Sequence, residues 1–201
     1  MEKLKYIMTD HTIPEPTTGG GGYSLTKGRP DWRLCAPVEI PVYDFLDVLG
    51  VEYHTLRHPA AFTIEQCRQV RDRVNVPVFK NLFLTNRQQT RFYLLLLPGE
   101  KIFKTKYLSA QIGSPRLSFA DESHMQRYLG VTPGSVTPMG LIHDVDKEVT
   151  LLMDRDLEQY EAFACHPCIN TASLIMKFDD LIHTIIPATG HDITWVSLPT
   201  E

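Results

Sequence analysis

The fold is decided by two apolar stretches, Val76-Pro-Val-Phe-Lys-Asn-Leu-Phe-Leu-Thr85 and Arg91-Phe-Tyr-Leu-Leu-Leu-Leu97. Both have the length of a strand and are rich in residues that favour β-structure. The segment between them, Asn86-Arg-Gln-Gln89, is polar and has the composition of a turn. These features predict a β-hairpin buried within a sheet.

Helical and strand patterns alternate irregularly around this hairpin. A helix is predicted from near Pro41, because Val42, Phe45, Leu46 and Leu49 recur at helical spacing and Gly50 follows as a stop. Further helices are predicted over 63–73, where Thr63 and Gln66 have capping-box spacing, and over 107–112, 121–129 and 178–183. Strands are predicted over 51–56, 141–142, 149–153, 163–165, 171–176 and 193–198. The mixture predicts a single α+β domain with a mixed, largely antiparallel sheet flanked by helices.

The chain of 201 residues is long enough for one well-buried domain. Residues 1–38 carry the glycine run Gly19–Gly22 and no sustained period, so we expect an N-terminal extension that is loop-like, followed by the compact domain over 39–201. No Lys-Ser/Thr pair follows the glycines, which argues against a phosphate-binding loop.

Composition places the chain among ordinary globular proteins, with 43% apolar and 22% charged residues. No apolar run approaches the roughly 18 residues that a membrane-spanning helix needs. The first residues lead into polar sequence and resemble no secretion signal. We therefore expect a cytoplasmic protein without a membrane partner, and its four cysteines are interpreted as reduced thiols.

Charge is distributed unevenly along the chain, whose formal net charge is −4. Between residues 68 and 106 there are nine lysines or arginines and two acids, whereas between 120 and 161 there are nine acids and three bases. A basic face on an acidic body suits a partner that presents a few phosphates at a defined place. Ordinary solvated surfaces explain the same pattern, so both interpretations stand.

Lys80 is the most informative single residue. It interrupts an apolar strand, and alternation makes it face opposite to Phe79 and Asn81. A lysine there either lies on a solvent-exposed face or presents its ammonium at the edge of a cleft, towards a carbonyl or phosphate oxygen.

Two later segments are also candidates. The loop Gly134-Ser-Val-Thr-Pro138 combines a rigid proline with a glycine that lets the backbone approach a ligand, although it is equally consistent with an ordinary connection. The segment Cys165-His-Pro-Cys168 has three interpretations: a zinc site, a redox pair, or two packing cysteines with His166 and Asn170 directed into a cleft. The sequence contains no Gly-x-Ser-x-Gly elbow, dinucleotide fingerprint or Walker loop.

These segments, with Leu117-Ser-Phe-Ala-Asp121, occur in an order and spacing that resembles the YbaK-like family, and within it the free-standing Ala-tRNA(Pro) deacylases related to the editing insertion of bacterial prolyl-tRNA synthetases. The resemblance covers about residues 40–198. It implies an α+β fold and a cleft for the aminoacylated 3′ end of tRNA. It also implies a catalytic set and a substrate-binding set: Lys80, Gly134 and His166 for catalysis, and Asn81, Ser135, Val136, Thr137, Pro138 and Asn170 for binding the substrate.

The resemblance further implies an aminoacyl-tRNA deacylase, a carboxylic ester hydrolase that needs no metal and no cofactor. A hydroxyl of the terminal ribose is thought in this family to help activate water. Its partners would be aminoacylated tRNA and prolyl-tRNA synthetase, with a monomer or a homodimer equally open.

A pocket shaped for proline cannot exclude the smaller alanine, because a missing methylene changes binding by only about 1–3 kcal/mol. A second, hydrolytic site is therefore needed, and alanine is the expected amino acid. Deacylation of cysteinyl-, seryl- or threonyl-tRNA and a non-catalytic module that senses aminoacyl-tRNA or an amino acid are the alternatives.

Overall fold

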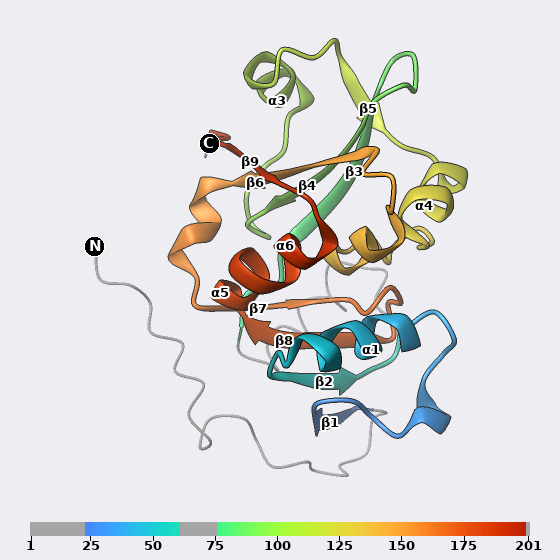
Figure 1. The fold of residues 1–201 in the computed structure, drawn as a ribbon. Helices are drawn as coiled ribbons and strands as arrows, with labels where there is room; N and C mark the ends of the chain where they lie inside the picture. The colour runs from blue at the N-terminus through green and yellow to red at the C-terminus, as the bar shows by residue number, and fades with distance from the viewer. Residues whose placement is uncertain (1–22, 61–75, 200–201) are drawn as a thin grey trace.

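The computed structural model describes residues 23–60 and 76–199. Four strands form an antiparallel sheet in the order β1-β2-β8-β7, which consists of β1 (Ser24–Lys27), β2 (Tyr53–Arg57), β8 (Ala172–Lys177) and β7 (Ala162–Cys165). In Figure 1 this sheet lies at the bottom of the molecule.

Five further strands form a mixed sheet in the order β5-β3-β4-β6-β9. The predicted hairpin is its centre: β3 (Lys80–Asn86) and β4 (Phe92–Leu97) are antiparallel, and β5 (Leu117–Phe119) is antiparallel to β3. β6 (Val149–Asp154) and β9 (Ile193–Val196) extend the sheet in parallel beyond β4. The α+β class and the mixed sheet are therefore confirmed.

The two sheets are joined just before β3. Val78 forms a parallel bridge with Ala164 of β7, and the amide of Ala164 donates to the carbonyl of Pro77 at 2.9 Å. Gly99 is needed beside this bridge, because a Cβ there would lie 2.6 Å from the carbonyl oxygen of Val78. Beyond the bridge the two strands diverge, and β3 enters the five-stranded sheet. We call this point the fork.

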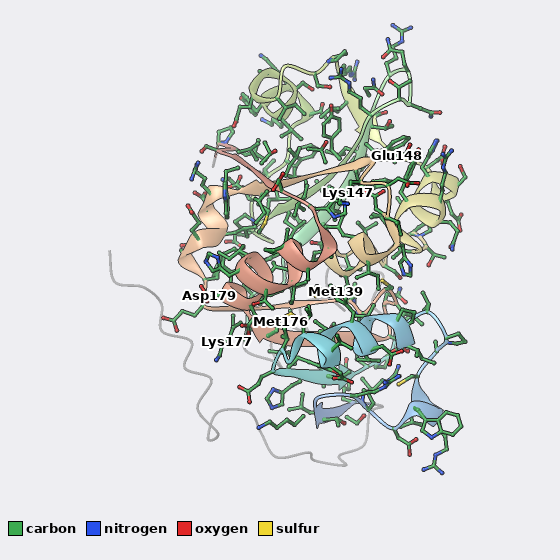
Figure 2. All side chains as sticks on the ribbon, in the orientation of Figure 1. Met139, Lys147, Glu148, Met176, Lys177 and Asp179 are labelled. Carbon is green, nitrogen blue, oxygen red and sulfur yellow. The ribbon has the colours of Figure 1, made fainter. Side chains whose placement is uncertain are left out.

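The joined sheet has two faces. One packs against α1 (Ile40–Leu49), α4 (Glu122–Leu129), the 3-10 helix η2 (Pro138–His143) and the C-terminal helical segments α5 (Phe178–Asp180), η4 (Leu181–Ile185) and α6 (Ile186–Thr189). Their apolar side chains form the central cluster, in which Met139 and Met176 are fully buried (Figure 2).

The opposite face is covered over the five-stranded sheet by α3 (Thr105–Gln111). Leu108 of α3 packs with Leu84, Leu95 and Leu97 in a second cluster, which we call the α3 cluster. Over the four-stranded sheet the same face carries a third cluster that includes Leu56, Ala164 and Ile175. The alternation of side chains along the strands assigns each residue to one of these faces.

Local sequence explains the ends of the helices. Gly50 ends α1 with a left-handed φ of 68°, as predicted from its position. Asp121 caps α4 by accepting a hydrogen bond from the amide of His124 at 3.0 Å.

Several predicted elements need correction. Residues Ser24–Lys27, expected to be loop-like, pair with β2 as an edge strand. The strand predicted over 141–142 is part of the 3-10 helix η2, because Thr137 caps this turn and Pro138 supplies a suitable first residue. The helix predicted over 178–183 continues to Thr189. The 3-10 helix η3 (Arg155–Gln159) was not predicted, and the helix expected over 63–73 lies outside the described residues.

Candidate functional site

Lys80 and His166 each lie two residues beyond the bridge between Val78 and Ala164, on the two strands that diverge at the fork. Lys80 begins β3 opposite Leu97, a member of the α3 cluster, so its side chain projects on that face. The ring of His166 lies 6.3 Å from that of His58, which is hydrogen-bonded at 2.9 Å to Ser173. Ser173 shares its face with Ile175 of the third cluster. Lys80 and His166 therefore lie on the same face of the joined sheet.

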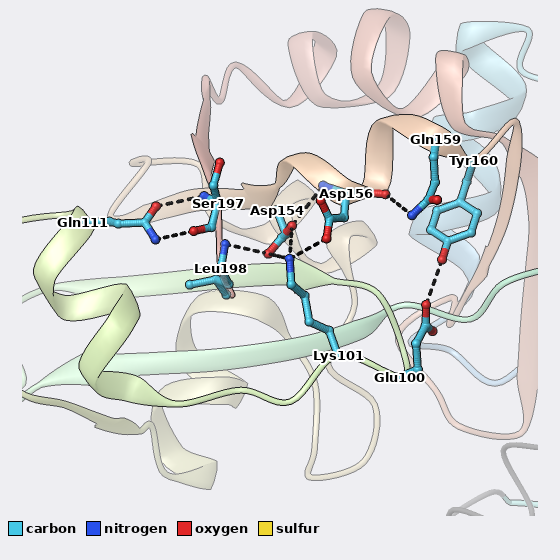
Figure 3. A network of polar contacts seen from close by, with 9 residues as sticks. All are labelled: Glu100, Lys101, Gln111, Asp154, Asp156, Gln159, Tyr160, Ser197 and Leu198. Carbon is cyan, nitrogen blue, oxygen red and sulfur yellow. Dashed lines mark hydrogen bonds and ion pairs between the residues drawn. The ribbon is translucent and has the colours of Figure 1, made fainter. Parts of the chain in front are cut away.

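The ammonium of Lys80 donates a hydrogen bond of 2.7 Å to the main-chain carbonyl of Lys101. Lys101 is itself anchored, because its buried ammonium lies 2.8 Å from Asp154 and 2.7 Å from Asp156 (Figure 3). Asp154 also accepts a hydrogen bond from the amide of Leu198. A buried ion pair at the end of β6 thus fixes the backbone that holds Lys80.

Asn81 faces the other way, as alternation predicts. It pairs with Leu96 of the central cluster and projects on that face, together with Phe79 and Phe83. Its Oδ1 atom is buried without a hydrogen-bond partner among the residues that the structure describes. The structure therefore does not bring the Asn81 side chain together with the ammonium of Lys80.

The loop from Gly134 to Pro138 is attached to the main chain of His166. Gly134 has a φ of 85°, which favours glycine. The buried hydroxyl of Thr137 donates to the carbonyl of His166 at 2.7 Å and accepts from the amide of Met139 at 3.3 Å. The loop is consequently held beside the turn that carries His166.

The amides of this loop differ in whether they are already hydrogen-bonded. The amide of Ser135 is engaged by the carbonyl of Thr132 at 3.0 Å. Within the described ranges, no acceptor is bonded to the amides of Gly134, Val136 and Thr137. These three amides, and not that of Ser135, are therefore the candidates for hydrogen bonds to a ligand.

His166 has a defined tautomer. Its Nδ1 atom lies 2.9 Å from the carbonyl oxygen of Ala172, which can only accept, so Nδ1 carries the proton and Nε2 is the acceptor. Burial lowers the pKa of His166, and the nearby His58 adds to this effect. The ring is therefore neutral near pH 7.

The lowered pKa values of the histidines predict a loss of stability in mild acid. Burial lowers the pKa of His58, His143 and His166 below the unfolded value of 6.5. As the pH falls, the unfolded chain therefore binds protons before the folded chain does. The contribution of these histidines to stability is complete above pH 6.5 and is lost as the pH falls through their folded pKa values. The loss is at most about 1.4 kcal/mol per pH unit for each histidine. Denaturant unfolding at about pH 7.5 and about pH 5 measures the free energy of unfolding at each pH. For His166→Asn this free energy should depend less steeply on pH than for the wild type. Equal slopes would contradict the assignment.

Cys165 and Cys168 are buried in the central cluster, and burial raises the pKa of each thiol to about 12. A raised thiol pKa disfavours the thiolate, which is the reactive form in redox chemistry. Among the described residues, no three histidine, cysteine, aspartate or glutamate side chains are grouped so as to hold a metal ion. The geometry thus favours the interpretation in which these cysteines are packing residues.

The remaining predicted site residues lie around this turn and loop. Asn170 is buried in the turn between β7 and β8, and Ser135 and Pro138 are buried, whereas Val136 is half-buried against the central cluster. The structure joins Thr137 to His166 directly, but it gives no direct contact between Lys80 and the loop. Sequence reasoning missed Lys101 and His58: the first lies in a basic run that resembles a solvated surface, and the second is an isolated histidine.

The described part of the chain contains no helix with the length and apolarity required to cross a membrane.

Comparison with known proteins gives the class to which this fold and site belong. The family model of the aminoacyl-tRNA editing domain matches residues 58–184, and the chain belongs to this family. It is 34% identical over 154 residues to the prolyl-tRNA editing protein ProX of Acetoanaerobium sticklandii, with 76% of this chain and 93% of that protein covered.

Two further proteins are similar. The prolyl-tRNA synthetase associated domain-containing protein 1 of Danio rerio is 31% identical over 151 residues, which cover 73% of this chain and 82% of that protein. The crystal structure of a candidate trans-editing enzyme for prolyl-tRNA synthetase superposes with a TM-score of 0.62 at 19% identity, covering 82% of this chain and 99% of that one. The second likeness concerns the fold alone.

Proposed function

We propose that the protein is a trans-editing deacylase that hydrolyses the ester between alanine and tRNA(Pro). The observation that carries the proposal is the fork, at which Lys80 and His166 lie on one face and the loop from Gly134 to Pro138 is attached to His166 through Thr137. Membership of the aminoacyl-tRNA editing family and the prolyl-tRNA editing named for the ProX relative support the choice of substrate.

In the proposed reaction, water adds to the carbonyl carbon of the aminoacyl ester. Negative charge develops on the carbonyl oxygen, where the amides of Gly134, Val136 and Thr137 can donate and the Lys80 ammonium supplies positive charge. The bond from the carbonyl carbon to the ribose oxygen then breaks, and the ribose oxygen takes up a proton, which releases alanine and tRNA with a free terminal hydroxyl.

Cys165 and Cys168 do not serve as nucleophiles in this scheme. Burial holds the pKa of Cys165 and Cys168 at about 12, so both thiols are protonated near neutral pH. We assign His166 the role of an orienting group, because its neutral Nε2 can accept a hydrogen bond from the amino group of the substrate. An aminoacyl ester is already reactive, and positioning together with charge stabilisation suffices for its hydrolysis.

The test is the release of the amino acid from Ala-tRNA(Pro) and Pro-tRNA(Pro) by the purified full-length chain, compared with spontaneous hydrolysis without protein. We expect rapid release of alanine and spontaneous rates for proline. Release from mischarged Cys-, Ser- or Thr-tRNA with none from Ala-tRNA(Pro) would replace alanine as the substrate. Binding of all these tRNAs without release would indicate a sensing module.

A further inference from the structure

The edge strand β5, which pairs with the end of β3 remote from Lys80, presents an exposed aromatic ring. Phe119 of β5 pairs with Leu84 of β3, and the amide of Ala120 donates to the carbonyl of Phe83 at 2.9 Å. Leu84 belongs to the α3 cluster, so Phe119 lies on the same face as Lys80. Lys80 and Leu84 are four residues apart, which corresponds to about 13 Å along a strand.

Phe119 is held in place but not covered. The rings of Phe119 and Phe103 are inclined at 68°, with 6.5 Å between their centroids, yet 62% of Phe119 is exposed. Two further apolar side chains nearby in the sequence are exposed. Ile102, before α3, is 54% exposed, and Tyr107, in α3, is 38% exposed. The sheet edge therefore offers an aromatic platform to a ligand with flat, apolar faces.

The same end of the molecule is strongly basic. Figure 1 shows the tip of the β3–β4 hairpin, α3 and β5 gathered at the end remote from the four-stranded sheet. These segments carry the exposed cations Arg87, Arg91, Lys104, Lys106 and Arg116. Between residues 80 and 120 the one acid is Glu100, whose carboxylate accepts a hydrogen bond from Tyr160 at 3.0 Å.

We infer that the aromatic pair Phe103 and Phe119, called here the β5 edge surface, binds the unpaired 3′ nucleotides of the tRNA, with the exposed cations of the adjoining segments at their phosphates. This inference rests on the proposed function, which locates the terminal ester at Lys80. Single-stranded nucleic acids are bound by aromatic rings that stack on bases and by cations that contact phosphates, and this end of the molecule carries both. An acidic protein partner would use the cations but would not require the exposed Phe119 ring.

The inference is tested by binding of uncharged tRNA(Pro) and of the same tRNA without its unpaired 3′ nucleotides. Phe119→Ala should weaken binding of the intact tRNA by about fivefold or more, the range typical of one lost base stack. The truncated tRNA should bind the wild type and this variant equally. Lys106→Gln with Arg116→Gln should lower the slope of log affinity against log salt by about 0.7 for each contact removed.

Matched controls lie on the four-stranded sheet and its approach. Trp32→Ala removes an aromatic side chain that is 71% exposed, and Lys27→Gln with Lys177→Gln removes two exposed cations; Figure 2 shows Lys177 on the outer surface of β8. These controls should bind tRNA as the wild type does. Unchanged binding by Phe119→Ala, or a loss that persists on the truncated tRNA, would overturn the inference.

Uncharged tRNA separates this inference from the proposed function, since no hydrolysis is measured. If the wild type binds through Phe119 but releases no amino acid, the proposed function fails and the binding surface stands. If the wild type deacylates Ala-tRNA(Pro) and Phe119→Ala has unchanged KM and kcat, the surface assignment fails and the deacylase stands.

Discussion

Replacing Lys80 with alanine is expected to lower kcat/KM for the release of alanine from Ala-tRNA(Pro) by about 10²- to 10³-fold, the usual loss for one group that stabilises developing charge. The substitution removes the ammonium that donates a hydrogen bond to the carbonyl of Lys101. Among the described residues, the half-buried side chain of Lys80 makes one hydrogen bond, so the fold should persist without it. Single-turnover deacylation with saturating protein measures the effect on the chemical step.

The matched controls for this prediction are two substitutions. Lys80→Arg keeps a positive charge and a donor towards Lys101, and it should retain more activity than Lys80→Ala. Lys177→Ala removes an exposed lysine from the far end of β8 and should leave deacylation unchanged. Wild-type rates for Lys80→Ala, with unfolding unaltered, would remove Lys80 from the mechanism.

Replacing Lys101 with methionine is expected to lower the free energy of unfolding by about 3–5 kcal/mol, because one partner of a buried ion pair is removed. Lys101 and Asp154 have side chains that are 1% and 0% exposed, so the carboxylate of Asp154 would remain buried without its cation. Denaturant unfolding followed by circular dichroism measures this loss.

Asp156→Asn is the control for Lys101→Met. Asp156 bonds the same ammonium at 2.7 Å, but its side chain is 48% exposed, and water screens its charge. Its replacement should therefore cost no more than about 1 kcal/mol. Equal losses for Lys101→Met and Asp156→Asn would show that burial of the pair does not control its contribution.

The sequence predicted the elements that local patterns specify. The hairpin of β3 and β4 was predicted because its strands are long and apolar, and α1 because its apolar spacing ends at Gly50. β1 and β5 were missed because four- and three-residue edge strands with exposed side chains carry little periodic signal. The strand predicted over 141–142 was wrong because a cap and a proline, Thr137 and Pro138, outweighed a short apolar pair.

The candidate site was predictable only in part, because some of its contacts join residues that are far apart in the sequence. The side of the sheet on which Lys80 projects follows from the alternation of side chains along a strand. The order of the motifs in the sequence indicated His166 and the Gly134–Pro138 loop. The parallel bridge between Val78 and Ala164 joins segments 86 positions apart, and no local pattern predicts such a pairing. The anchoring of Lys101 by Asp154 is equally non-local, so its role emerges only from the three-dimensional structure.

The hydrogen-bond acceptor of Lys80 is a main-chain carbonyl. This affects both how the hydrogen bond could be lost and whether the charge of the ammonium is neutralised. Substituting the side chain of residue 101 leaves the carbonyl in place, so the tether is lost only if the backbone itself shifts. A carbonyl is also uncharged, in contrast to the two carboxylates that neutralise the ammonium of Lys101. Among the described residues, no carboxylate is paired with the Lys80 ammonium, which can therefore attract an incoming anionic or strongly polarised oxygen.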